Sequence, residues 1–291
     1  MNDFYSGVGL WNYDLNSLED IFQETELHPD TEIEARDDAG ANTDKKIEIT
    51  RYLKDNLAIR ERGFVYRDGS FVRQEVFPII ESDRKATSDD VELIELKNCR
   101  GSLARVDQAQ LGCTLFAYVQ NLYEVTDGEN LTDESRILYN GISLTGLSDS
   151  GMILLPKGEQ KDEELEKIEG RRRKIKKDVF SGNDDAYEEL TLTEMEIYSK
   201  IDKWVKNNGV YGVIQNTFMP KSVEEDVYFV IGTIEDCRET KIFNGQLVYQ
   251  LDLSCCGLNF IIAINRSCLL GEPKEGRRFK GRVWMQSKIL I

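Results

Sequence analysis

The segment that organises the chain lies near its C-terminus and reads Gly271-Glu272-Pro273-Lys274-Glu275-Gly276-Arg277-Arg278-Phe279-Lys280-Gly281, followed by Arg282-Val283-Trp284-Met285-Gln286. Its glycines and proline are typical of turns, because glycine adopts left-handed backbone angles and proline has a fixed φ. The residues after them favour a β-strand, which we expect over residues 282–291. The segment therefore predicts a loop that leads into a basic terminal strand.

Three further strands are expected before this segment. Residues 227–234 are rich in β-branched and aromatic side chains, residues 246–253 alternate in polarity, and residues 258–264 form a continuous apolar run. The sequence Phe243-Asn244-Gly245 carries the signal of a hairpin turn. Four strands with a connection before the last one predict a small, highly twisted sheet or a partial barrel. This prediction is similar to oligonucleotide-binding barrels only in architecture, which does not by itself imply a function.

The first half of the chain reads mostly as antiparallel sheet with one or two helices. Asn16 or Ser17 can cap a helix in which Leu18, Ile21 and Phe22 share one face. An acidic loop is expected over residues 30–46. The remaining expected elements are a hairpin over residues 57–77 with its turn at 67–70 and its end at Pro78, strands at 91–97 and 111–123, and a second hairpin formed by 142–146 and 152–155 around a turn at 148–151.

A sharp change in composition follows this half. Residues 157–178 hold almost no apolar side chains and place acidic residues before basic ones, which suits a charged, exposed helix or a linker. Residues 183–219 read as helical, because apolar and aromatic residues recur at helical spacing. We therefore expect an α+β protein with two lobes: a sheet-rich lobe at 1–156 and, after the charged segment at 157–178, a lobe at 179–291 with helices and then four strands.

Composition excludes several classes of protein. Of the 291 residues, 40% are hydrophobic and 31% are charged, so the chain can build a core and lacks the composition of a disordered protein. Its formal net charge of −16 argues against nonspecific binding of nucleic acid, which requires a cationic surface. The first residues lack the basic region of a signal peptide, and no apolar run reaches the about 18 residues of a membrane span. With six cysteines and no dense disulfide pattern, a cytoplasmic protein with reduced thiols is expected.

The sequence carries no recognisable catalytic or metal-binding motif. The single histidine, His28, follows the first predicted helix and reads as a surface or capping residue, which disfavours triads that need a positioned imidazole. No C-x-x-C pair is present, so the usual zinc ligands are missing. Cys255 and Cys256 are adjacent and would face opposite sides of a strand. Residues 224–226 read as a solvated acidic turn. We predict no catalytic residue, no metal and no cofactor.

The candidate binding residues are Arg277, Arg278, Lys280, Arg282 and Trp284, all in the opening segment. Cations interleaved with aromatic side chains can hold phosphates and stack on bases. The alternative, which we favour, is structural. In that case the two loop glycines set turns, Phe279 fills the core, and the cations pair with carboxylates of an acidic protein. Both interpretations remain open at this point.

Three stretches resemble an uncharacterised family of bacterial proteins, a domain of unknown function from Gram-positive anaerobes. They are Phe218-Met219-Pro220, Glu224-x-Asp226-x-Tyr228, and the segment from Leu269 to Gln286 that contains GEPxxGRRFKGxxWxQ. Residues 143–156 are also similar, and the first 130 residues less so. The chain departs from the family pattern beside Asp226, where a cysteine is expected, and at Ser287, where a glycine is expected. The resemblance implies a bacterial cytosolic origin and assigns no catalytic residue.

Three classes of function follow from these observations. The first is a non-catalytic binding or regulatory protein that acts through contacts with an unidentified protein partner; it rests on the missing motifs and the acidic composition. The second is a nucleic-acid or nucleotide binder that uses the basic C-terminal segment. The third and weakest is a carboxylate-dependent hydrolase, which would need a pocket with at least two convergent carboxylates. We expect no membrane partner.

Overall fold

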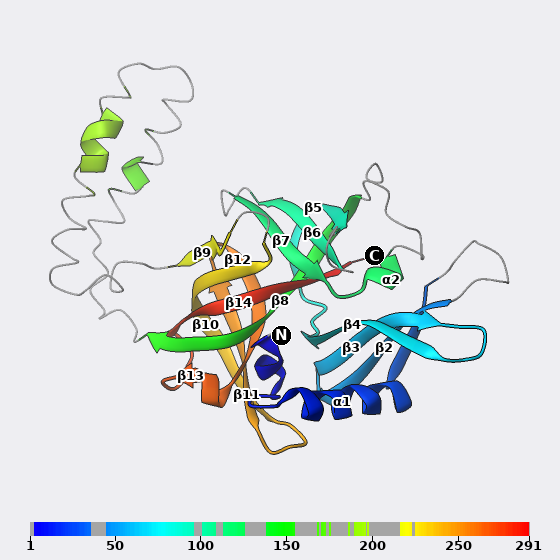
Figure 1. Cartoon of the computed structure of the whole chain (residues 1–291). Helices are drawn as coiled ribbons and strands as arrows, with labels where there is room; N and C mark the ends of the chain where they lie inside the picture. Colours follow the sequence, from blue (N-terminus) through cyan, green and yellow to red (C-terminus); the bar gives the residue numbers. More distant parts are fainter. Residues whose placement is uncertain are drawn as a thin grey trace. The chain divides into compact units, whose positions relative to one another are not determined.

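The structure is a computed structural model of the chain (Figure 1). The chain forms two compact units: Leu155–Gln215 is one, and Met1–Leu154 joins Asn216–Ile291 in the other. The structure describes residues 3–35, 45–95, 101–108, 113–125, 138–154, 168, 170–172, 175, 186, 189–195, 197, 216–222 and 225–290.

The first sheet of the larger unit has four antiparallel strands in the order in which they follow along the chain. They are β1 (Thr31–Glu34), β2 (Lys45–Lys54), β3 (Leu57–Val65) and β4 (Phe71–Ile80). The prediction of an acidic loop over residues 30–46 is wrong at its two ends, because β1 pairs with β2 there and an ion pair of 2.9 Å joins Glu34 to Lys45. The middle of that loop, residues 36–44, lies outside the described residues.

The hairpin of β3 and β4 is confirmed, with one correction at Pro78. The turn closes through a hydrogen bond of 2.9 Å from the Tyr66 backbone N–H to the Ser70 carbonyl, and Gly69 has the left-handed φ of +84°. Pro78 does not end β4, which continues to Ile80. The proline is tolerated because β4 is an edge strand of this sheet, where a missing N–H breaks no ladder bond to a further strand.

A short 3-10 helix contacts both sheets of the larger unit, and a longer α-helix packs on the first sheet. They are the short 3-10 helix η1 (Asp3–Val8) and the helix α1 (Leu15–Leu27), which buries Leu18 and Phe22. The predicted helix is therefore confirmed. Its N-cap is Asp14, whose side chain accepts a hydrogen bond of 2.8 Å from the Ser17 backbone N–H. The helix thus begins before the predicted caps, because Asp14 has the extended backbone and the short acceptor side chain of an N-cap.

The second sheet contains a closed five-stranded barrel. The strands pair in the order β10 (Val227–Lys241), β11 (Leu247–Cys255), β12 (Leu258–Asn265), β8 (Leu138–Leu154) and β14 (Arg278–Ile289), and β14 returns to β10. All of these pairs are antiparallel except β12 with β8. The predicted C-terminal strands and the turn at residues 243–245 are confirmed, and the predicted partial barrel is a closed one.

Further strands extend this barrel. The strands β5 (Lys85–Glu95), β6 (Ser102–Gln108) and β7 (Cys113–Val119) lead from β8 back to β14, while β9 (Thr217–Pro220) pairs with β10 and β13 (Leu269–Leu270) with β8. The short helices are α2 (Leu122–Val125) and η2 (Arg266–Cys268). The strands β5 and β7 correspond to the predictions at 91–97 and 111–123, and α2 occupies the end of the latter.

The prediction of a hairpin around residues 148–151 is wrong. The two expected strands are parts of the single strand β8, which pairs with β14 from Ile142 opposite Ile289 to Leu154 opposite Arg278. The polar residues that read as a turn lie at a β-bulge, where Asp149 is the extra residue. A bulge bends a strand without reversing it. The residues opposite the bulge, Arg282 and Val283, lie more than 130 positions later in the chain, so local sequence could not distinguish a bulge from a turn.

The long strand β8 joins the two predicted lobes. Because β8 pairs with β12, β13 and β14, strands from residues 1–156 and 179–291 share one sheet. The polypeptide leaves this unit after β8, forms the unit of residues 155–215, and returns at β9. The described part of the chain is mostly β, and helix is less prominent than the α+β prediction implies.

Residues 155–215 are described only in part, and their described residues are helical. Arg171 lies 3.0 Å from a Glu189 carboxylate oxygen, and Arg172 lies 3.1 Å from that of Glu194. Two arginines of the basic run, Arg171 and Arg172, therefore pair with acidic residues of the following helical stretch. Most of the predicted segment at 157–178 lies outside the described residues. No helix in the described ranges has the length and apolar character to cross a membrane.

Candidate functional site

The strand β14 carries most of the binding residues predicted from sequence. Phe279, Val283 and Met285 are fully buried in the apolar interior of the barrel. Arg278, Lys280, Arg282 and Trp284 alternate with these residues along the strand and therefore point to its other side. The structural role expected for Phe279 is confirmed.

The loop before β14 is stabilised by contacts between its own charged residues. The Arg277 Nη1 donates a hydrogen bond of 2.6 Å to the Glu272 carbonyl, and the Lys274 Nζ lies 2.8 Å from a Glu272 carboxylate oxygen. The contact with Lys274 lowers the pKa of Glu272. Gly271 and Gly276 have left-handed φ angles of +94° and +77°, as the turn interpretation requires. Arg277 thus contributes to the conformation of the loop.

The other three cations differ in exposure. Arg278 is buried, and this burial lowers the pKa of its guanidinium. Lys280 is half-buried. Arg282 forms an ion pair with Asp149, the extra residue of the β8 bulge, and its guanidinium lies 5.4 Å from the centre of the Phe4 ring. The sequence suggested that these cations pair with carboxylates, and Arg282 forms such a pair.

Trp284 is a buried structural residue, with only 6% of its surface exposed. Its Nε1 donates a hydrogen bond of 2.6 Å to a carboxylate oxygen of Asp226, and its ring packs against Phe4 and Tyr118 at 5.8 and 5.2 Å. Burial raises the pKa of Asp226, and the hydrogen bond from Trp284 opposes that shift. Asp226 is therefore an internal partner of Trp284, which corrects the prediction of a solvated turn at this residue.

The last residue of the family motif, Gln286, belongs to a buried polar network that sequence reasoning missed. Its side-chain amide N–H donates a hydrogen bond of 2.8 Å to the Pro78 carbonyl on β4. Its amide oxygen accepts a hydrogen bond of 2.8 Å from the side chain of Gln120, which follows β7. Gln120 also donates 3.0 Å to the Ile80 carbonyl. The two glutamine side chains thus connect the first sheet to the strands of the second.

Two buried arginines of β3 complete this network, which we call the arginine cluster (Arg60, Arg62 and their partners). Arg62 donates to Glu48 at 2.7 Å, to the Tyr118 hydroxyl at 2.9 Å, and to the carbonyls of Val119 and Gln120 at 2.9 and 2.6 Å. Arg60 donates to the same Gln120 carbonyl at 3.0 Å and to Glu81 at 2.5 Å. Burial opposes the charge of Arg62, but Tyr118, Glu48 and Glu75 outweigh it and raise its pKa.

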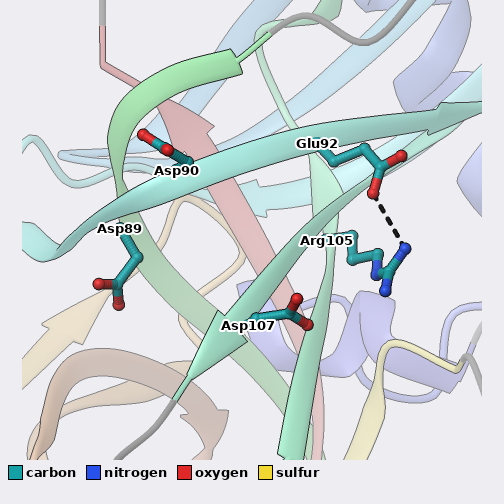
Figure 2. A pocket seen from close by; sticks show the side chains of 5 residues that line it. All are labelled: Asp89, Asp90, Glu92, Arg105 and Asp107. Carbon is teal, nitrogen blue, oxygen red and sulfur yellow. Dashed lines mark hydrogen bonds and ion pairs between the residues drawn. The ribbon is translucent and has the colours of Figure 1, made fainter.

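A concave surface lies elsewhere, on the outer face of β5 and β6. We call it the acidic pocket; it is a hollow of about 270 Å³ lined by Asp89, Asp90, Glu92, Arg105 and Asp107 (Figure 2). Glu92 and Arg105 are opposite each other in the strand pair, and Arg105 donates 3.0 Å to Glu92. The described lining thus holds four carboxylates and one guanidinium, a formal charge of −3, and only Glu92 is paired with Arg105.

The carboxylates of the acidic pocket differ in their contacts. The Thr87 hydroxyl donates 2.7 Å to Asp89, and the Thr114 hydroxyl donates 2.8 Å to Asp107. Asp89, Asp90 and Asp107 are exposed to solvent, while Glu92 and Arg105 are half-buried. Among the lining residues that the structure describes there is no serine, cysteine or histidine nucleophile. Among the described residues, no group of three or more His, Cys, Asp or Glu side chains is placed to hold a metal ion.

Sequence reasoning did not find the acidic pocket. The signal was present as Asp89-Asp90-x-Glu92 and Arg105-x-Asp107, in which every second residue lies on one face of a strand. The prediction began the strand only at residue 91 and did not identify β6, so these side chains were not assigned to a common face.

The histidine and the paired cysteines have structural positions. His28 is exposed at the C-cap of α1, where its backbone N–H bonds to the Glu24 carbonyl at 3.0 Å, as predicted for a surface or capping residue. The prediction that Cys255 and Cys256 face opposite sides of a strand is wrong. Cys256 lies in the turn after β11 with a φ of +52°, which brings the two sulfur atoms to 3.9 Å.

Comparison with known proteins identifies the family. No curated protein and no solved structure matches the chain. One family model matches residues 7–287, and its description reads "Domain of unknown function, E. rectale Gene description". The match extends well beyond the C-terminal motif and confirms the resemblance to a family from a Gram-positive anaerobe. The chain therefore belongs to the domain-of-unknown-function family DUF3881.

Proposed function

We propose that the protein is a non-catalytic binding protein that acts through protein contacts in the bacterial cytoplasm, with the acidic pocket as its contact surface. The observation that carries this proposal is that four carboxylates and only one guanidinium, that of Arg105, are found among the described residues that line this hollow on an outer strand face. The excess of three negative charges favours a cationic group of a partner, because carboxylates form charge-assisted hydrogen bonds with lysine and arginine.

The size of the acidic pocket supports a partner side chain as its occupant. Its volume of about 270 Å³ is slightly below the range of about 300–1,000 Å³ that is usual for small-molecule sites. Asp89, Asp90 and Asp107 are exposed and can steer a basic segment during encounter. The proposed partner therefore presents a lysine or arginine from a basic segment.

Two observations weigh against nucleic-acid binding by the C-terminal segment. The ring of Trp284 is buried and is not accessible for stacking on a base. Oligonucleotide-binding barrels bind their ligands on an outer strand face of the barrel. The outer side of the hairpin β11–β12 is covered here, since Val248 and Ala263 lie in one buried cluster with Phe4 and Val8 of η1.

The proposal is tested by affinity purification from the native host, followed by mass spectrometry of bound proteins and nucleic acids. We compare the wild type with the double variant Asp90→Asn, Asp107→Asn. The matched control is Asp20→Asn, Glu32→Gln, which removes the same charge from exposed positions on α1 and β1. All three proteins should have similar melting temperatures, because the changes are on the surface.

A direct measurement of affinity then uses the captured partner, at two salt concentrations. We expect the pocket variant to bind about tenfold or more weakly, with a smaller salt dependence, and the control to bind like the wild type. Equal affinity of the pocket variant and the wild type would refute the acidic pocket as the contact surface. Recovery of nucleic acid alone would favour the alternative function.

A second candidate is a carboxylate-dependent hydrolase, because the acidic pocket contains more than the two carboxylates that this chemistry needs. It is the weaker candidate, since a catalytic acid is usually shielded from water and three of these carboxylates are exposed. A screen with chromogenic glycoside and phosphoester substrates tests it. Turnover that disappears in Asp90→Asn and in Asp107→Asn would establish a hydrolase in place of the binding function.

A further inference from the structure

One buried carboxylate belongs neither to the acidic pocket nor to the arginine cluster. Glu61 lies on β3 with 0% of its surface exposed, on the side of the strand opposite to Arg60 and Arg62. Neither of its carboxylate oxygens accepts a hydrogen bond from the described residues. Glu61 forms an ion pair with Arg73 on β4, whose Nη1 lies 3.7 Å from the Glu61 Oε2. Keeping a buried carboxylate charged without hydrogen bonds costs free energy.

Arg73 is shared with two further carboxylates, both on α1. Glu19 forms an ion pair with Arg73, and the Glu26 Oε1 lies 3.5 Å from the Arg73 Nη1. The guanidinium also lies 5.1 Å from the centre of the Phe22 ring, between these two glutamates along the helix. Three carboxylates therefore face one cation where α1 packs on the first sheet.

Burial of Glu61 favours its protonated form. Burial raises the pKa of Glu61 to about 8, Arg73 lowers it, and Glu26 and Glu19 raise it further. Tyr5 of η1 also faces Glu61, and burial together with that carboxylate raises the pKa of Tyr5. At neutral pH, Glu61 is therefore mostly protonated while α1 is in place.

We propose that pH controls the attachment of α1 to the first sheet, and we call this attachment the clasp. The packed position of α1 is favoured only while Glu61 keeps its proton. When α1 lifts away, Glu61 reaches water and releases its proton, so rising pH favours the open form. The helix is suited to this role because it is lightly attached. It buries Leu18, Phe22 and Thr25 only, and Leu15 and Leu27 at its ends are exposed. This inference is independent of the acidic pocket.

Hydrogen exchange of the α1 amides tests the clasp between pH 5 and 9. The wild type is compared with Glu61→Gln at each pH, since this comparison cancels the pH dependence of the exchange chemistry itself. In the wild type, the opening constant of α1 should rise about tenfold per pH unit from pH 5 and level off above about pH 8. In Glu61→Gln it should be independent of pH, because the amide keeps the shape of the side chain and has no proton to release. Amides of β12 serve as the reference for global unfolding.

Two results would overturn the proposal. One is the same pH dependence in the wild type and in Glu61→Gln; the other is an opening constant of the α1 amides equal to that of the β12 amides at every pH, which would mean that α1 detaches only when the whole unit unfolds. If Glu61→Gln does not fold, Glu26→Gln is the second variant. It keeps Glu61 and removes a facing carboxylate, so the opening constant should level off at a lower pH, and an unchanged profile would also refute the clasp.

Discussion

Replacement of Arg62 by methionine should destabilise the protein by about 3–5 kcal/mol, the cost of breaking a buried ion pair. Methionine preserves the apolar stem of arginine and removes every hydrogen-bond donor. Arg62 is only 1% exposed, so water cannot replace those donors without reorganisation of the protein. The change tests whether the arginine cluster holds the first sheet to the second.

The magnitude follows from the groups that lose a partner. The Glu48 carboxylate is fully buried and would be left with Arg60, whose Nη1 lies 3.4 Å from it. The Tyr118 hydroxyl and the Val119 carbonyl would also lose their bonds of 2.9 Å to Arg62. A buried polar group without a partner costs about 1–3 kcal/mol, and more if it is charged, so the sum reaches the stated range.

The assay is urea denaturation followed by far-ultraviolet circular dichroism, with the denaturant slope checked for constancy among variants. Arg62→Lys should recover only part of the loss, because one ammonium cannot reproduce the several donor directions of a guanidinium. The double variant Arg62→Met, Glu48→Met should be more stable than Arg62→Met alone, since no uncompensated carboxylate remains. Arg238→Met, at an exposed position on β10, is the matched control and should have little effect.

A loss below about 1 kcal/mol for Arg62→Met would refute this reasoning, because it would mean that water or a rearranged side chain satisfies Glu48. Strict additivity of the two substitutions in the double variant would refute the pairing of Arg62 with Glu48.

Three further predictions concern other buried contacts. Gly281→Ala would place its Cβ 2.3 Å from the Phe279 ring and 2.6 Å from the Ser150 carbonyl oxygen, so thermal denaturation should show a loss of about 1–3 kcal/mol, and an unchanged midpoint would contradict the packing. Trp284→Phe leaves the buried Asp226 carboxylate without its donor and should cost about 2–4 kcal/mol in urea denaturation; adding Asp226→Asn should recover part of this, and no recovery would argue against the pair. Glu61 has a pKa raised from 4.5 to about 8, so its contribution to stability is full below pH 4.5 and is lost as pH rises towards 8, by about 5 kcal/mol in total. Glu61→Gln should abolish that pH-dependent fall in the free energy of unfolding, and persistence of the fall would assign it to other groups.

Much of the local structure could be predicted because it depends on nearest neighbours. The hairpin between β10 and β11 is an example, since Gly245 has a left-handed φ of +83° and its N–H bonds to the Ile242 carbonyl at 2.9 Å. The same reasoning placed α1 and the turn at Gly69. It failed at residues 148–151, where the same polar residues form a bulge opposite β14.

The candidate site was less predictable than the fold. The basic C-terminal segment attracted interest because cations and aromatics are dense in sequence, yet the structure buries Trp284 and pairs Arg282 with Asp149. The acidic pocket went unnoticed because Asp90 and Asp107 come from different strands and meet only through the pairing of β5 with β6. The concentration of cations and aromatic residues in the sequence therefore identified residues of the family motif. The position of the concave surface depended instead on which strands pair with each other.

By itself, the sequence determined the strand and turn positions of the C-terminal half, the lack of a recognisable catalytic motif and the family of the chain. Only the tertiary structure decided that β8 closes the barrel with β12 and β14, that Arg62 is buried, and that Glu61 shares one cation with two carboxylates of α1. The reason is physical. Turn and strand propensities act over a few residues, whereas strand partners and desolvation depend on residues that are far apart in the chain.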